Sequence, residues 1–105
     1  MNKKILLNTG ILRTAADKSL GKKIWSEAKD DIFSALDNND TIIISFPQEL
    51  RRASTAFFNG FFEALVEEEK KFKVSDINKH FELDSDHPGF ERINKTYQQY
   101  LEANV

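Results

Sequence analysis

The feature that most constrains the fold is the run Thr41–Phe46, with the sequence TIIISF. Its β-branched, apolar side chains are typical of a strand that is covered on both faces. Pro47 follows the run and ends it, because proline has no N–H to donate to a sheet ladder. We therefore expect this run to be the central strand of the molecule, with other elements packed against both of its faces.

Two helical patterns flank the run. Residues 17–36 carry apolar side chains at helical spacing, and Asp17 or Ser19 can cap that helix. Residues 55–70 form a second helix, whose wide apolar face predicts deep burial against the sheet. We expect the buried side chains to be Phe57 or Phe58, Phe61 and Leu65. Small residues recur at every fourth position and would let a neighbouring backbone approach closely: Ala56, Gly60 and Ala64.

Weaker patterns complete the element order. Residues 4–8 read as a short apolar strand, and residues 72–74 and 79–83 alternate as short, half-buried strands do. A last helix follows Asp86, which we expect to cap it, with Pro88 in the first turn. Strands and helices thus alternate along the chain. This order predicts an α/β fold, with a mixed or mainly parallel central sheet of about four strands packed by about three helices.

The composition fits a single domain that spans residues 1–105. Hydrophobic residues make up 40% of the chain, which is enough for one core, and the net charge of −2 gives no general attraction to nucleic acid or membrane surfaces. The first apolar run is too short for a signal peptide, and no stretch approaches the ~20 apolar residues of a membrane span. Cysteine is absent, which excludes disulfides and thiolate metal sites. We expect a cytoplasmic protein.

Histidine and acidic side chains gather in residues 80–87, but their spacing fits no metal template. In a calcium-loop frame that begins at Asp84, Pro88 stands at position five and Lys95 at position twelve, where a bidentate carboxylate is required. The two histidines do not match zinc spacing either. The sequence has no Gly-x-Ser-x-Gly elbow and no glycine-rich phosphate loop. We therefore expect a protein that is not an enzyme and takes no metal or cofactor.

The most informative stretch for function is Arg51–Gly60. Ser54 stands at the start of the second helix, where backbone N–H groups and the helix dipole favour an anion. Arg51 and Arg52, just upstream, could pair with a phosphate. Phosphorylation of Ser54 would add roughly −1.5 to −2 charges at this junction. The alternative is that Ser54 is an unmodified N-cap, which contributes about 1 kcal/mol to helix stability.

Two segments carry a family resemblance: the strand Thr41–Phe46 followed by Ala53–Gly60 (ASTAFFNG), and the helix start Ser19–Lys23 (SLGKK). They resemble the STAS-like domains of bacteria and their mobile elements, which are related to anti-sigma-factor antagonists. The resemblance implies a regulatory domain that binds other proteins. It also implies a partner of the kinase-like ATPase class, which phosphorylates a serine at this junction. By position that serine is Ser54, with Thr55 beside it.

Three functions stay open on these grounds. The first is a regulatory protein-binding module that docks on a partner, with a kinase-like ATPase as one candidate, through Ser54, Thr55, Arg51, Arg52 and Asn59. The second is a small phage-type inhibitor or accessory protein. It would have the same fold, block a host factor, and lack the phosphorylation switch. The third is a nucleotide or small-molecule sensor that uses the helix start at Ser54 as a phosphate site.

Overall fold

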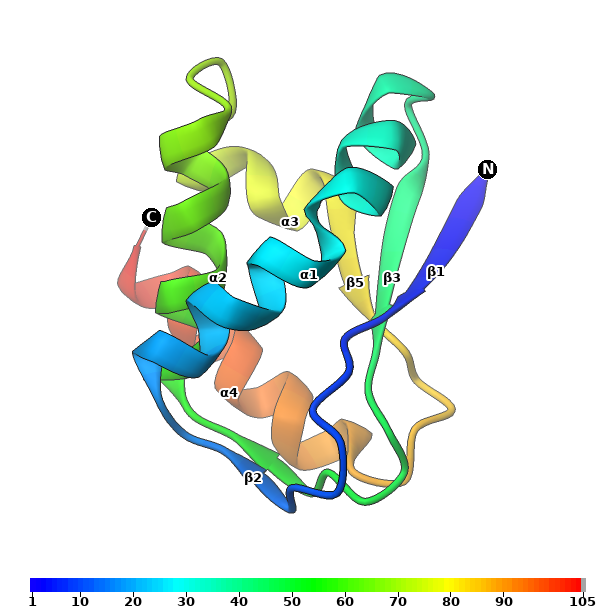
Figure 1. Ribbon diagram of the computed structural model, residues 1–105, viewed down its shortest axis with the longest axis vertical. Helices are drawn as coiled ribbons and strands as arrows, with labels where there is room; N and C mark the ends of the chain where they lie inside the picture. The colour runs from blue at the N-terminus through cyan, green and yellow to red at the C-terminus, as the bar shows by residue number, and fades with distance from the viewer. Residues whose placement is uncertain (105) are drawn as a thin grey trace.

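The central sheet has three parallel strands, which lie beside the helices in Figure 1. The computed structural model describes residues 1–104. β1 (Asn2–Leu6) and β5 (Phe81–Leu83) both pair with β3 (Thr41–Ser45), so β3 is the central strand, as the sequence predicts. A separate parallel ladder joins β2 (Thr14–Ala15) to β4 (Arg52–Ala53). The α/β class is confirmed, but one sheet of about four strands is wrong, because the chain segments after β1 and β3 pair with each other instead of widening the sheet.

Three long helices pack against the sheet and against one another: α1 (Lys18–Asp37), α2 (Thr55–Glu68) and α4 (Phe90–Ala103). A single-turn helix, α3 (Ile77–His80), follows the 3-10 turn η1 (Val74–Asp76) and leads into β5. Among residues 1–104, no helix combines the length and the apolar character needed to cross a membrane.

The strands expected at residues 72–74 and 79–83 are largely wrong. Only Phe81–Leu83 is a strand, while the residues before it form η1 and α3. A carboxylate oxygen of Asp76 accepts the backbone N–H of Lys73 at 3.0 Å, which stabilises the helical turn. Short apolar runs with such spacing fit a helical turn as well as a strand, and the local hydrogen bond decides between them.

The start of the last helix also differs from the prediction. α4 begins at Phe90 with Gly89 at the N-cap position, so Asp86 does not cap it and Pro88 precedes its first turn. The reason is a turn before the helix, in which the Asp84 carboxylate accepts the N–H of Asp86 at 3.0 Å. At α1 the cap position is Asp17, as expected, although its side chain accepts no capping hydrogen bond.

The helices cover only one face of the sheet. Apart from Lys3, which is exposed at the edge, the side chains of that face are buried: Ile5, Ile42, Ile44, Phe81 and Leu83. On the opposite face, Lys4, Leu6 and Glu82 are exposed and Ile43 is half-buried. We call this second surface the open face. The expectation that β3 is covered on both faces is therefore wrong.

The strand order explains the open face. The order β1-β3-β5 follows the chain without a reversal. Right-handed crossovers, which nearly all such connections have, then place successive helices on the same side of the sheet. A doubly wound sheet covers its second face because its strand order reverses, and this sheet lacks that reversal.

α1 and α2 touch through their backbones. A methyl group on Gly60 would overlap the carbonyl oxygen of Lys18, and one on Gly21 would lie 2.8 Å from the amide nitrogen of Phe61. The close approach expected from the small-residue row is therefore confirmed at Gly60. Ala56, in the same row, is exposed and lies outside this contact.

Aromatic side chains of α2 fill the core. The predicted burial of Phe57, Phe58, Phe61 and Leu65 is confirmed. Phe62 also packs edge-to-face on Phe81 of β5, with ring centroids 5.2 Å apart.

Trp25 of α1 packs against the same aromatic core. It meets Phe61 edge-to-face at 5.6 Å, and its indole N–H donates to a carboxylate oxygen of Glu68 at 3.1 Å. The indole thus connects the middle of α1 to the C-terminal turn of α2.

Candidate functional site

Ser54 forms the junction between β4 and α2. Its hydroxyl oxygen accepts the N–H of Phe57 at 3.1 Å, which confirms the predicted N-cap. The same hydroxyl donates to the carbonyl oxygen of Ala16 at 2.6 Å, and the Ser54 amide donates to Ala15 at 2.8 Å. The side chain is half-buried. Ser54 therefore also fixes the start of α2 to the segment that precedes α1.

The other residues predicted for this site lie on separate parts of the surface. The Arg51 guanidinium donates to the carbonyl oxygens of Gln48 and Leu50, within its own loop. Arg52 lines a hollow beside α4, whereas Thr55 and Asn59 line another with the C-terminal end of α4. Within residues 1–104, no hydrogen bond or ion pair joins either arginine to Ser54. The structure thus does not gather the five residues into one pocket.

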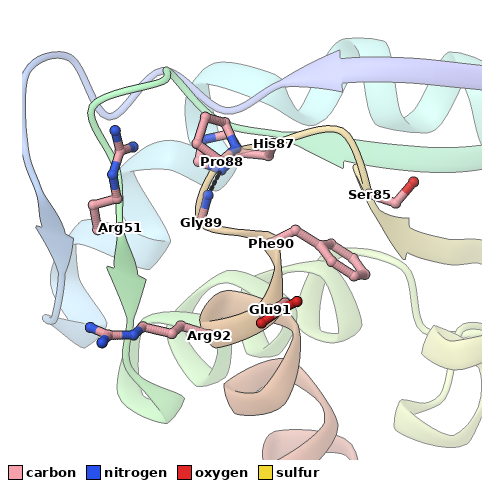
Figure 2. A pocket seen from close by; sticks show the side chains of 8 residues that line it. All are labelled: Arg51, Ser85, His87, Pro88, Gly89, Phe90, Glu91 and Arg92. Atoms are coloured by element: carbon pink, nitrogen blue, oxygen red, sulfur yellow. Dashed lines mark hydrogen bonds between the residues drawn. The ribbon is translucent and has the colours of Figure 1, made fainter.

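A hollow of about 410 Å³ lies at the start of α4 and is shown in Figure 2. Arg51 and Arg92 lie on one side of it in this view, and Ser85 lies on the other. Glu91 stands between them, so the hollow has no uniform charge. The arrangement does not direct several donors at one point, as a tight anion site requires.

His87 lines this hollow, but its ring is committed to the backbone. The ring is buried, and its Nδ1 accepts the N–H of Gly89 at 2.9 Å. Its Nε2 lies 2.8 Å from the carbonyl oxygen of Pro47 and donates to it. These partners require the neutral ring with its proton on Nε2. His87 therefore joins the β3–β4 and β5–α4 connections, and both of its nitrogens are already used.

Residues 80–87 are rich in histidine and acidic side chains, but these side chains do not converge on one point. Across the described residues 1–104, no three His, Asp or Glu side chains are placed to hold one ion. The Asp84 carboxylate instead contacts Ser45 and Lys4 on the neighbouring strands.

A polar cluster on the open face joins β1, β3 and the residue that follows β5. One carboxylate oxygen of Asp84 accepts the Ser45 hydroxyl at 2.9 Å and lies 3.3 Å from the Lys4 ammonium. Partial burial opposes ionisation of Asp84. The N–H of Asp86, the Ser45 hydroxyl and Lys4 outweigh that effect, so the pKa of Asp84 lies below its ordinary value. Asp84 is therefore a fixed negative charge, and it holds Lys4 against the sheet.

An exposed apolar side chain lies beside this cluster: Leu6 shares the open face with Lys4, pairs with Ser45 in register and is 58% exposed. Sequence reasoning missed this surface, because it assumed two covered faces for β3. The sequence carries no clear signal of it, because residues 4–7 do not alternate between polar and apolar side chains.

Comparison with protein-family models, with curated proteins and with solved structures gave no match, so the likeness to STAS-like domains stays a resemblance of the quoted segments.

Proposed function

We propose that this chain is a non-enzymatic regulatory module that binds a protein partner through the open face of its central sheet. The observation that carries the proposal is the open face itself. Parallel sheets are almost always covered on both faces, because their crossover connections place helices there. A parallel sheet with one face open is therefore a surface that a partner can complete.

The chemistry of the open face supports this proposal. Leu6 is exposed there and Ile43 is half-buried, with the Lys4–Asp84 pair beside them. In the sheet register Ile43 lies beside Lys4, so apolar and charged side chains are mixed on this face, as they are in non-obligate protein interfaces. The described residues offer no comparable support for catalysis, because the buried histidine, His87, has no free nitrogen.

Regulation through Ser54, which the resemblance implies, belongs to the proposal as a separate step. A phosphoryl group on this oxygen would remove the O–H that the Ala16 carbonyl accepts. It would also set a doubly negative group beside that carbonyl. Phosphorylation would therefore act by releasing the start of α2 from the segment before α1.

A site-specific photo-crosslinker tests the docking surface. We expect a crosslinker at Leu6, introduced in the source cell, to form a discrete adduct with one protein, which is then purified. The matched control is a crosslinker at Gln99, an exposed residue of α4 on the helical layer.

The purified partner then gives a quantitative test. Leu6→Asp should weaken binding at least about tenfold, because it replaces an exposed apolar side chain of the open face with a charge, whereas Gln99→Asp should leave affinity unchanged. Leu6 is exposed, so thermal unfolding should show that the variant stays folded. An adduct formed from Gln99 and not from Leu6, or equal affinities of the two variants, would refute the proposal.

A further inference from the structure

β1 has a free edge along its whole length. It pairs with β3 on one side, and no strand or helix of the described residues pairs with its other side. The register from Asn2↔Thr41 to Leu6↔Ser45 is continuous, so no bulge turns the edge away. In Figure 1, β1 forms the outer border of the sheet. Exposed edges of this kind are templates for pairing with another chain.

The backbone groups that face this edge can be identified. Leu7 donates its N–H to the carbonyl of Ser45 at 2.8 Å, and the Met1 carbonyl accepts from Thr41 at 2.9 Å. Odd-numbered residues therefore bond to β3. Since alternate residues of a strand direct their N–H and C=O groups to opposite sides, Lys4 and Leu6 direct theirs to the free edge.

The side chains along the edge select the partner. Lys3 and Lys4 point to opposite faces of the strand, and within residues 1–104 Lys3 makes no ion pair. Antiparallel self-pairing in the register that uses the whole strand would set Lys4 opposite Lys4 of a second copy. Like charges directly opposite are unfavourable, so the lysines disfavour a second copy and favour an acidic strand.

We infer that the protein partner contributes an extended acidic segment, which adds to the sheet as a fourth strand along the free edge of β1. This inference rests on the proposed protein-binding function and names how the partner is held. The segment carries acidic side chains opposite Lys3 and Lys4, and an apolar side chain opposite Leu6. Main-chain hydrogen bonds supply affinity in this mode of recognition, and the flanking side chains supply specificity.

Synthetic peptides test the chemistry of the partner. The probe is a short capped peptide of alternating valine and threonine with two consecutive glutamates at its centre, and the control carries two lysines instead. We expect saturable binding of the acidic peptide only. Lys3→Glu should weaken it about tenfold, while Lys23→Glu, the same charge change on the exposed surface of α1, should have little effect. Equal binding of both peptides, or equal loss in both variants, would overturn the inference.

Amide hydrogen exchange tests the geometry of the complex. The N–H groups of Lys4 and Leu6 should exchange rapidly in the free protein and become protected when the acidic peptide saturates it. The N–H of Ile5 points to β3 and should be protected in both states. N-methylation of the alternate peptide amides that face β1 should abolish binding, and methylation of the other set should not. Binding without protection of Lys4 and Leu6 would overturn strand addition.

Two further results separate this inference from the proposed function. If the partner crosslinked through Leu6 binds without protecting the amides of Lys4 and Leu6, strand addition is wrong and docking on the open face stands. If the acidic peptide protects those amides while Leu6 gives no adduct, the edge is a binding site and the open face is not. Sedimentation showing a dimer that Lys3→Glu alters would identify a second copy as the occupant and overturn the inference.

Discussion

Ser54 shows how a single side chain can serve two elements at once. As a cap it satisfies one N–H of α2, and as a donor it holds the Ala16 carbonyl before α1. The sequence predicts the first role, because serine before an apolar helix is a common cap. It could not predict the second, since Ala16 and Ser54 are brought together only by the pairing of β2 with β4.

Ser54→Ala should lower the free energy of unfolding by about 1–2 kcal/mol, because it removes the cap and leaves the Ala16 carbonyl without its donor. Ser54→Asp keeps a capping acceptor but cannot donate to Ala16, so it should also be less stable than the native chain. Urea denaturation of both variants measures these changes, with the neighbouring Thr55→Ala as the control. Native stability of Ser54→Asp would show that the Ala16 bond contributes nothing.

At the scale of elements, the paired glycines of α1 and α2 are the clearest constraint. Glycine inside a helix costs about 1 kcal/mol relative to alanine, so its presence needs a compensating contact. The structure supplies that contact, with Gly21 against Phe57 and Phe61, and Gly60 against Lys18. The spacing of small residues predicts such an approach, but only the folded structure shows which helix makes it.

Gly60→Ala should destabilise the protein by roughly 1–3 kcal/mol or more, although alanine is the better helix former, because its methyl group would force α1 and α2 apart. The control on the same helix is Ala56→Gly, at an exposed position, which should cost about 1 kcal/mol through helix propensity alone. Chemical denaturation measures both changes. A stabilised Gly60→Ala variant would show that the two backbones are not in contact.

The element boundaries show where sequence reasoning failed. It found the long elements, whose periodicity is unambiguous, and it misassigned residues 72–80, where Asp76 closes a local turn. It also assigned the cap of α4 to Asp86, although the Asp84 carboxylate organises the preceding turn. In both places a carboxylate bonded to a backbone N–H decides the structure over a short range, which apolar periodicity does not report.

For the molecule as a whole, the unreversed strand order is the property that sequence could not reveal. The alternation of strands and helices predicts parallel pairing, but the same alternation fits one covered face or two. Which of these forms depends on strand order, and that order is set by tertiary packing. The candidate site on the open face was missed for this reason, while the Ser54 cap, a local feature, was predicted correctly.

Global stability should fall in alkali because both tyrosines of α4 are buried. Burial raises the pKa of Tyr97, whose hydroxyl donates to the Phe81 carbonyl at 3.1 Å, and raises the pKa of Tyr100 to about 12. At pH values below the ordinary tyrosine pKa of about 10, the folded and unfolded chains both keep their tyrosine protons, so the stabilisation is complete. As the pH rises toward 12 the unfolded chain loses protons that the folded chain retains, so the free energy of unfolding falls.

Absorbance near 295 nm checks this expectation, since the chain has two tyrosines and both belong to α4. Phenolate absorbance should rise only as the protein unfolds, and Tyr100→Phe should reduce the loss of stability between pH 10 and 12. Reversible ionisation of both tyrosines near pH 10, with the circular dichroism of the folded state unchanged, would contradict the burial.

The position of Trp25 has a practical consequence for all of these experiments. It is the chain's single tryptophan, and it lies between α1 and α2 with its N–H on Glu68. We therefore expect its fluorescence to respond more strongly to the separation of those two helices than to events on the outer border of the sheet. A ligand that protects the amides of Lys4 and Leu6 from exchange without changing the emission binds at the sheet edge. A ligand that shifts the emission changes the packing of α1 and α2. The protein thus carries an internal optical reporter that distinguishes occupancy from unfolding.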